Sequence, residues 1–343
     1  MTGNEILSVE GLARHFVAPA SVTDRLLGRK SVVNRAVDGV DLVLRKGETL
    51  GLVGESGCGK STLARCMVGL QSLTEGSIRY DGVPLSGRRS RAQQRALQMV
   101  FQDPYSSLNP RMTVGQMLSE LLRYHKLVPR KETGARCREL MRLVGLPERA
   151  LDQRPRQFSG GQRQRVGIAR ALALEPTVLI ADEPVSALDV SVQATIINLL
   201  AELRRTLDLS IIFVSHNMAV VRQISDRTAV MYRGRIVETG NTETVFDDPV
   251  HPYTKLLLGS VPRLLTAGGT SGTGAVAAAA EGTTREEVTM SATAAGTSPC
   301  RFLDRCPSTV AGCADEPGLL ADPRAADRSA ACVHVAARAG VVA

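Results

Sequence analysis

A glycine-rich stretch, GESGCGKS at residues 54–61, has the residue types and spacing to bind a phosphate group. It fits the pattern G-x-x-x-x-G-K-[ST] and lies between an apolar run, residues 49–53, and a helix-like segment, residues 62–70. Gly54, Gly57 and Gly59 allow a tight turn whose backbone N–H groups face an anion, and the following helix adds its positive N-terminal dipole. Lys60 can reach the β- and γ-phosphates of a nucleotide, and the Ser61 hydroxyl can bind Mg²⁺. The stretch therefore predicts a nucleotide phosphate site.

Two adjacent carboxylates, Asp182 and Glu183, follow the continuous apolar run TVLIA at residues 177–181. Such a run is typical of a buried strand in a parallel sheet, and the carboxyl ends of these strands are where ligands bind. An aspartate there can hold hydrated Mg²⁺, and a glutamate can polarise the water that attacks the γ-phosphate. We therefore expect Asp182 and Glu183 to complete a site for phosphoryl chemistry.

Gln102 and His216 also come directly after, or one residue after, predicted strands, at residues 97–101 and 209–214. A side-chain amide in that place could reach Mg²⁺ or the attacking water. The histidine would face the same crevice and could sense the γ-phosphate, although by itself it would more often be structural.

Two further features are open to more than one interpretation. Ser159, in FSGGQRQR at residues 158–165, is a good N-cap for a helix expected over residues 162–174, and the two glycines leave N–H groups exposed to whatever docks there. Phe16 lies on a predicted strand ahead of the phosphate loop, where it could stack on adenine or simply belong to the core.

The remaining elements give an α/β fold. Alternating apolar positions predict strands over residues 6–17 and 36–44 in an antiparallel region, with a basic surface loop over residues 19–35 between them. Helical periodicity over residues 113–156 predicts a helical subdomain inserted into the core. A turn closed by Asp189 precedes a helix over residues 192–207. A hairpin over residues 229–237 and short helices over residues 243–246 and 255–258 follow.

Composition narrows the choice of partners and location. The 343 residues carry a formal net charge of +8, but the basic residues are scattered, and aromatics are only 3% with no Trp. Base-stacking platforms for nucleic acid are therefore poorly supported. No segment approaches the roughly 20 apolar residues that span a bilayer, and residues 1–10 lack the apolar core of a signal peptide. We expect a cytosolic protein unless a partner holds it at a membrane.

The C-terminal part combines a low-complexity segment with a group of cysteines. Residues 266–298 are dominated by Ala, Gly, Thr and Ser, which predicts a flexible linker. Four of the seven cysteines follow within 33 residues: Cys300, Cys306, Cys313 and Cys332. Disulfides are disfavoured in a reducing cytosol, so a metal site is the more natural interpretation. The spacing lacks the paired C-x₂-C of common zinc sites, so zinc is not strongly indicated.

Taken together, six separated elements stand in one order that resembles the ATP-binding subunits of ABC transporters. They are the Walker A stretch at residues 54–61, the glutamine Gln102, the signature Ser159 to Gln162, the Walker B pair Asp182 and Glu183, the D-loop ending at Asp189 and the switch histidine His216. Phe158 stands where the family usually has Leu. The match covers about residues 5–255.

Within that family, three stretches look like the dipeptide and oligopeptide importer branch, with the closest resemblance to its F-type subunit: residues 54–61, QDPYSSLNP at 102–110 and HPYT at 251–254. The resemblance implies an ABC-type nucleotide-binding domain of the P-loop NTPases over residues 5–255, with a helical signature subdomain over about residues 103–165. A C-terminal helix and linker over residues 256–298 and a cysteine-containing region over residues 299–343 would follow.

The resemblance also implies the roles of the site residues. Glu183 and His216 would be catalytic, and Mg²⁺ would be bound by Ser61, Gln102 and Asp182. The nucleotide-binding residues would be Phe16, Gly54, Ser56, Gly57, Cys58, Gly59, Lys60, Ser61, Thr62 and Gln102. Such subunits pair head to tail, so that the signature of one caps the ATP of the other. The signature residues are Ser159, Gly160, Gly161 and Gln162.

The partners implied are two transmembrane permease subunits, a second ATPase that is a D-type sister or a copy of this chain, and indirectly an extracellular solute-binding protein, with no nucleic acid. The chain would lie on the cytoplasmic face of the membrane. Some peptide-importer ATPases hold a [4Fe-4S] cluster on four cysteines and have a Cys-Pro pair like Cys306-Pro307. The resemblance therefore predicts a cluster on Cys300, Cys306, Cys313 and Cys332, with zinc next and free thiols last.

Two other functions share these motifs. Nickel importers closely resemble peptide importers, so the same ATPase could serve a different small solute. A soluble ABC ATPase of DNA repair or translation would have the same core, but such proteins usually fuse two cassettes or add long coiled coils, and this chain has one cassette and no heptad repeat.

Overall fold

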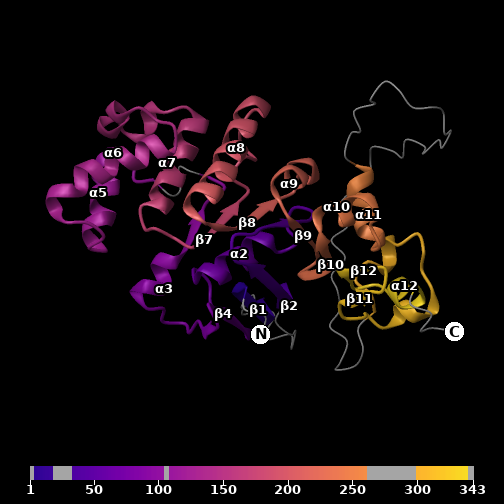
Figure 1. The fold of residues 1–343 in the computed structure, drawn as a ribbon. Helices are drawn as coiled ribbons and strands as arrows, with labels where there is room; N and C mark the ends of the chain where they lie inside the picture. The colour runs from indigo at the N-terminus through magenta and orange to yellow at the C-terminus, as the bar shows by residue number, and fades with distance from the viewer. Residues whose placement is uncertain (1–3, 18–32, 104–107, 261–298, 339–343) are drawn as a thin grey trace, which may run out of the picture.

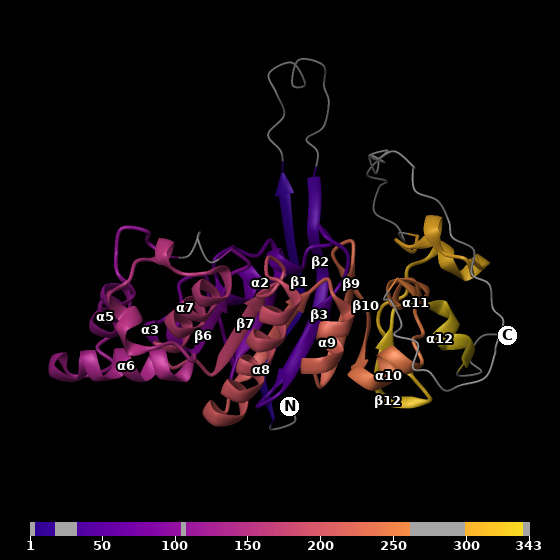
Figure 2. The same ribbon diagram turned by 90° about the horizontal axis from the view of Figure 1, so that it is seen from above.

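The computed structural model describes residues 4–17, 33–103, 108–260 and 299–338, which form two β-sheets with flanking helices (Figures 1 and 2). The larger sheet has the order β11-β12-β10-β9-β3-β8-β7-β6. Its five parallel strands are β3 (Thr49–Val53), β6 (Leu97–Val100), β7 (Val178–Asp182), β8 (Ser210–Ser215) and β9 (Arg227–Tyr232). Every residue of β3, β7 and β8 is buried, which explains their unbroken apolar runs. The parallel core sheet expected from the sequence is confirmed.

The smaller sheet is antiparallel, in the order β2-β1-β4-β5. Its strands are β1 (Glu5–Val17), β2 (Val33–Arg45), β4 (Glu75–Tyr80) and β5 (Val83–Pro84). The expected loop over residues 19–35 is wrong at its C-terminal end, because β2 already begins at Val33. Phe16 pairs with Asn34 there, since backbone pairing does not require buried side chains. Residues 18–32 lie outside the described residues.

Helices pack on the larger sheet and extend beyond one end of it. Three of them follow its strands: α2 (Lys60–Val68), α8 (Val190–Leu207) and α9 (Met218–Ile224), whereas α3 (Arg91–Ala96) directly precedes β6. Beyond β6 lies a helical lobe, whose helices α5, α6 and α7 are labelled in Figure 2. It consists of α5 (Val114–Tyr124), η1 (Arg130–Glu132), α6 (Thr133–Leu143), η2 (Glu148–Asp152), η3 (Pro155–Gln157) and α7 (Gly160–Leu172). Leu118, Leu122 and Leu140 are fully or almost fully buried within it. The inserted helical subdomain is thus confirmed, with α7 beginning two residues earlier than expected.

The C-terminal elements lie at the opposite end of the larger sheet (Figures 1 and 2). They are β10 (Arg235–Asn241), α10 (Thr242–Asp247), α11 (Pro252–Gly259), η4 (Leu303–Arg305), η5 (Ala311–Ala314), β11 (Leu320–Asp322), β12 (Ala325–Ala330) and α12 (Val333–Arg338). β12 pairs with β10, so the cysteine-containing region continues the larger sheet. The expected linker, residues 266–298, lies outside the described residues, and the division of the chain into domains stays a prediction.

Candidate active site

The loop from β3 to α2 has the backbone conformation of a phosphate cradle. Gly59 has φ 110°, and a Cβ added there would lie 2.1 Å from the carbonyl oxygen of Ala36. Gly57 has φ 81°, a value that L-residues rarely adopt. Only glycine fits both positions without strain, and the helix α2 begins directly afterwards at Lys60. The loop therefore presents N–H groups and a helix N-terminus on the same side.

The ammonium group of Lys60 is buried at the centre of this loop. The residue is 4% exposed, and its Nζ donates to the carbonyl oxygens of Gly54 at 2.8 Å and of Glu55 at 2.9 Å. A buried cation needs such oxygen partners. Lys60 therefore supplies a fixed positive charge where the loop would enclose phosphate groups.

Ser61 and Asp182 meet at the carboxyl end of β7. The Ser61 hydroxyl donates to Oδ1 of Asp182 at 2.9 Å, and Asp182 is 1% exposed. Burial raises the pKa of the Asp182 carboxyl, while the hydrogen bond from Ser61 opposes the shift. A hydroxyl and a carboxylate are the hard oxygen ligands that Mg²⁺ prefers, so these two residues fit a magnesium site.

The carboxylate of Glu183 contacts two polar side chains, Gln102 and His216, which lie just beyond the ends of β6 and β8. Its Oε2 lies 3.2 Å from Nε2 of Gln102 and 3.3 Å from Nδ1 of His216. Its backbone has φ 45°, and its N–H donates to the carbonyl of Val214. The strand order β8-β7-β6 brings the three side chains to one edge of the sheet. Together they can orient a water molecule beside the phosphate loop.

The signature residues begin helix α7. The Ser159 hydroxyl accepts from the N–H of Gln162 at 3.3 Å, and the Gln162 side chain accepts from the N–H of Ser159 at 3.0 Å. This capping box was not expected from the sequence, which indicated only the serine cap. A Cβ on Gly161 would lie 2.3 Å from Cγ1 of Val192 in α8. Close packing of α7 on α8 is thus a second reason for this glycine.

Two predicted residues lie at other places in the fold. Phe16, near the end of β1, is 36% exposed, and the guanidinium carbon of Arg14 lies 4.7 Å from its ring centroid. Asp189 caps helix α8, where its carboxylate accepts from the N–H of Val192 at 3.0 Å and from the Ser191 hydroxyl at 2.7 Å. These hydrogen bonds lower the pKa of the Asp189 carboxyl. Phe16 is thus an accessible aromatic surface, whereas Asp189 has a clear role in helix capping.

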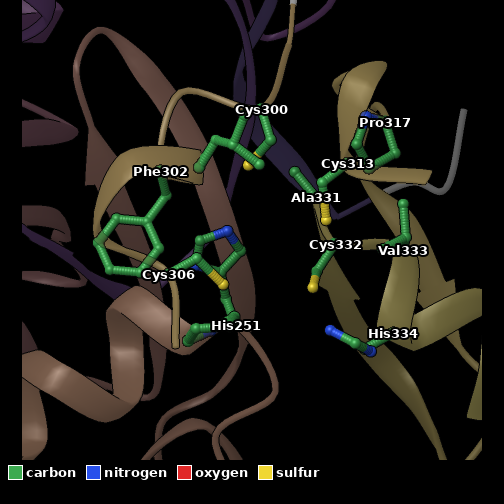
Figure 3. A pocket seen from close by; sticks show the side chains of 12 residues that line it. His251, Cys300, Phe302, Cys306, Cys313, Pro317, Ala331, Cys332, Val333 and His334 are labelled. Atoms are coloured by element: carbon green, nitrogen blue, oxygen red, sulfur yellow. The ribbon is translucent and has the colours of Figure 1, made fainter. Parts of the chain in front are cut away.

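The four C-terminal cysteines line one cavity beside His251 and His334 (Figure 3). All four are free thiols, and the backbone N–H of Cys300 donates to the carbonyl of Cys313. Burial raises the pKa of the Cys300 and Cys332 thiols, and the other thiols add to the shift. In the described part of the chain, no three His, Cys, Asp or Glu side chains are grouped closely enough to hold one metal ion.

Sequence reasoning missed two C-terminal residues that contact the phosphate loop. The hydroxyl of Tyr253 accepts from the N–H of Glu55 at 2.9 Å. The Arg305 guanidinium donates to both carboxylate oxygens of Glu55, at 3.0 and 3.1 Å. Tyr253 belongs to the HPYT stretch, which is a signal that could have drawn attention to it.

Two family models match the chain. The model described as "ABC transporter" matches residues 37–186, and the model described as "Oligopeptide/dipeptide transporter, C-terminal region" matches residues 237–313. The chain is 46% identical over 263 residues to the oligopeptide transport ATP-binding protein OppF of Bacillus subtilis, covering 75% of this chain and 83% of that protein. It is 53% identical over 232 residues to OppF of Escherichia coli, covering 66% and 70%. A putative peptide import ATP-binding protein of Brucella abortus is 46% identical over 307 residues, covering 88% and 87%.

Solved structures show the same fold. CbiO1 from Clostridium perfringens, part of the ABC transporter complex CbiONQ, aligns with a TM-score of 0.61 at 30% identity, over 71% of this chain and 92% of that one. The ATP-binding cassette MJ0796, in a dimeric post-hydrolysis state with ADP and phosphate, aligns with a TM-score of 0.60 at 26% identity, over 69% and 99%.

Proposed function

This chain belongs to the ATP-binding subunits of dipeptide and oligopeptide ABC transporters, and on that premise we propose that its ATP hydrolysis powers the import of peptides through a membrane permease. The observation that carries the mechanism is the meeting of Gln102, Glu183 and His216 beside the phosphate loop. The assignment of peptides as the cargo rests on the relatives, whose names specify oligopeptide transport or peptide import. No observation favours nickel or a soluble role in DNA repair or translation.

Some of these residues bind the nucleotide and its metal ion, and others activate the attacking water. The loop N–H groups and Lys60 hold the phosphates, and Phe16 stacks on adenine. Ser61, Asp182 and Gln102 would hold Mg²⁺, which would neutralise charge on the phosphates. Glu183 orients the attacking water and takes its proton, and His216 contacts the γ-phosphate.

A second ATPase subunit completes each site. Ser159, Gly160, Gly161 and Gln162 start a helix whose N-terminal dipole can approach a phosphate bound on another subunit. Support comes from the related cassette MJ0796, whose structure is a dimer. The partner is a D-type sister or a copy of this chain, with Asp189 in the loop between the two sites. Contact with the γ-phosphate drives closure, because a ligand shifts an equilibrium only through unequal affinity.

The transporter assembly places the chain at the cytoplasmic face of the membrane. Within the described residues, no helix has the length and apolar character to cross a bilayer. We propose that two permease subunits hold the chain there as a peripheral subunit, and that an extracellular solute-binding protein delivers the peptide.

The four cysteines are the candidate ligands of a [4Fe-4S] cluster. Supporting this, all four line one cavity, and the Cys306 sulfur accepts from the N–H of Ser308 at 3.4 Å, a contact that also stabilises ligating thiolates. A single zinc ion is the alternative, but it has less support, because among the described residues no three His, Cys, Asp or Glu side chains are grouped around one point. Iron and sulfide quantified in anaerobically purified protein test the cluster; their absence from folded protein, with zinc bound or with free thiols, would refute it.

Affinity purification of the tagged chain from native membranes, followed by mass spectrometry, tests the transport function. We expect two permeases, a sister ATPase or an untagged copy, and a peptide-binding protein. Recovery of DNA-repair or ribosomal factors would overturn transport while leaving the ATPase assignment intact, and a nickel-binding protein would change the cargo.

A further inference from the structure

Glu55, the second residue of the phosphate-binding loop, is held from three sides. Its carbonyl oxygen accepts from Nζ of Lys60 at 2.9 Å, inside the loop. Its N–H donates to the hydroxyl of Tyr253, and its carboxylate faces the guanidinium of Arg305. The last two contacts come from C-terminal elements, so the geometry of this loop depends on residues outside the ATPase motifs.

Arg305 is oriented by aromatic rings as well as by its ion pair. Its guanidinium carbon lies 5.9 Å from the ring centroid of Tyr232 and 5.7 Å from that of Phe302. Cation–π contacts and two hydrogen bonds to one carboxylate fix the plane of the guanidinium. The Arg305 and Glu55 side chains are 41% and 40% exposed, so the ion pair is partly screened by water and salt.

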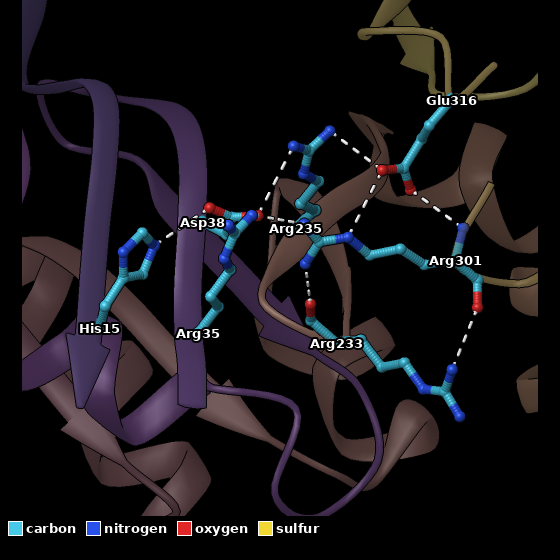
Figure 4. Close-up of polar contacts among 7 residues, drawn as sticks. All are labelled: His15, Arg35, Asp38, Arg233, Arg235, Arg301 and Glu316. Atoms are coloured by element: carbon cyan, nitrogen blue, oxygen red, sulfur yellow. Dashed lines mark hydrogen bonds and ion pairs between the residues drawn. The ribbon is translucent and has the colours of Figure 1, made fainter. Parts of the chain in front are cut away.

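A second arginine of the same segment, Arg301, contacts strand β2 of the smaller sheet (Figure 4). Arg301 forms an ion pair with Asp38 of β2. Asp38 also lies 3.1 Å from Nε2 of His15, the neighbour of Phe16 in β1. Arg301 is held in turn by Glu316, at 3.4 Å. The strand end that carries Phe16 is therefore tied to the C-terminal region.

Each arginine is next to a cysteine in the chain: Arg301 directly follows Cys300, and Arg305 directly precedes Cys306. The stretch at residues 300–306 is compact, because the N–H of Leu303 donates to the carbonyl of Cys300 at 2.9 Å, and the N–H of Cys306 donates to the carbonyl of Leu303 at 3.2 Å. Whatever fixes the thiols of Cys300 and Cys306 in their cavity therefore also fixes Arg301 and Arg305.

We propose that residues 300–306 form a strap that positions the nucleotide site from outside the ATPase core, with Arg305 as the positioning residue that holds and neutralises Glu55. The inference rests on the ATP-binding role of this loop and on no particular cargo. Without Arg305, an uncompensated carboxylate remains in a loop that must bind a polyanion, so ATP binds more weakly. When Glu55 is also made neutral, no carboxylate is left to repel the phosphates.

Titration of the full-length protein with a fluorescent ATP analogue tests this proposal. We expect Arg305→Met to raise the Kd about 2- to 5-fold at low salt, the range for a partly exposed ion pair, and by less at high salt. In the Glu55→Gln background no carboxylate remains to be held or neutralised, so adding Arg305→Met should change the Kd little, and the double variant should match Glu55→Gln alone. Arg305→Lys, which keeps the charge but loses the bidentate geometry, should fall between wild type and Arg305→Met.

Arg222→Met is the matched control, because Arg222 pairs with Glu243 and packs over Phe246, away from the loop. Its Kd should equal that of wild type. An unchanged Kd in Arg305→Met would overturn the proposal, as would an Arg305→Met substitution that raises the Kd as much in the Glu55→Gln background as in the wild type. Should Arg305→Met not fold, Arg305→Lys with and without Glu55→Gln decides by the same criterion. Loss of ATP binding by the wild type would instead contradict the ATPase function.

Discussion

The side-chain amide of Gln102 lies 3.2 Å from the carboxylate of Glu183, although 81 residues separate them in the chain. They meet because β6 and β7 are parallel neighbours whose carboxyl ends lie at one edge of the sheet. Gln102 lies two residues after the end of β6, in the segment that leads toward the helical lobe. Any movement of that lobe would therefore act close to Glu183, the carboxylate that we propose activates water.

Glu183→Gln should preserve ATP binding and trap the closed pair. The amide keeps the shape of the side chain but cannot accept a proton from water, so turnover of the assembled transporter should fall by about 100-fold or more. ATP hydrolysis and nucleotide retention measured on the same preparation check this. Near-normal turnover would remove Glu183 from its role.

Phe16→Ala should weaken ATP binding about tenfold, because stacking on one base contributes roughly 1–3 kcal/mol. Phe16 is 36% exposed, so thermal stability should change little. Val17→Ala, at a neighbouring exposed position of β1, is the control. Tripolyphosphate has no base, so competition with it tests whether Phe16 acts on adenine or on the phosphates. If tripolyphosphate binding falls as much as ATP binding, Phe16 does not stack on adenine.

Gly161→Ala should destabilise the subunit by about 1–3 kcal/mol, because its Cβ would overlap Val192. Adding Val192→Ala should recover most of that loss in denaturant unfolding. Gly160→Ala should cost less, since its Cβ would lie 3.2 Å from a flexible methyl of Leu188. If the double variant is stable but its assembled pair still hydrolyses ATP slowly, the glycine also serves the partner's ATP, as we expect. No recovery of stability would contradict the packing role.

Asp38→Asn should lower thermal stability at neutral pH. Burial alone would raise the pKa of the Asp38 carboxyl, but Arg301, His15 and Arg235 outweigh it and hold the pKa below its usual value of 3.8. The ionised group therefore stabilises the fold above that pH, and the benefit is lost as the pH falls below about 3.8. Melting temperatures measured from neutral pH to below pH 3.8 check this pH dependence. The difference in melting temperature between Asp38→Asn and wild type should become smaller only on acidification. A gap that does not depend on pH would show that packing, not charge, is lost.

The sequence is sufficient to predict the phosphate loop, the carboxylates and the strand ends, because those residues are adjacent in the chain to the apolar runs that position them. The contact of Arg305 with Glu55 could not be predicted, since an exposed arginine 250 residues from its partner leaves no periodic signal. Nor does a six-residue strand such as β12 identify its neighbour β10. The packing of Gly161 against Val192 could not be predicted either, because the glycine already has an explanation as part of the signature.

Peptide uptake by the reconstituted transporter tests the central claim most directly. Proteoliposomes containing this chain, its permeases and its sister ATPase should accumulate labelled peptide when ATP and the loaded binding protein are supplied on their proper sides. Lys60→Ala in this chain should abolish ATP-dependent uptake, because the phosphate site loses its buried cation. ATP hydrolysis that proceeds without peptide accumulation, or uptake of nickel in place of peptide, would contradict the account.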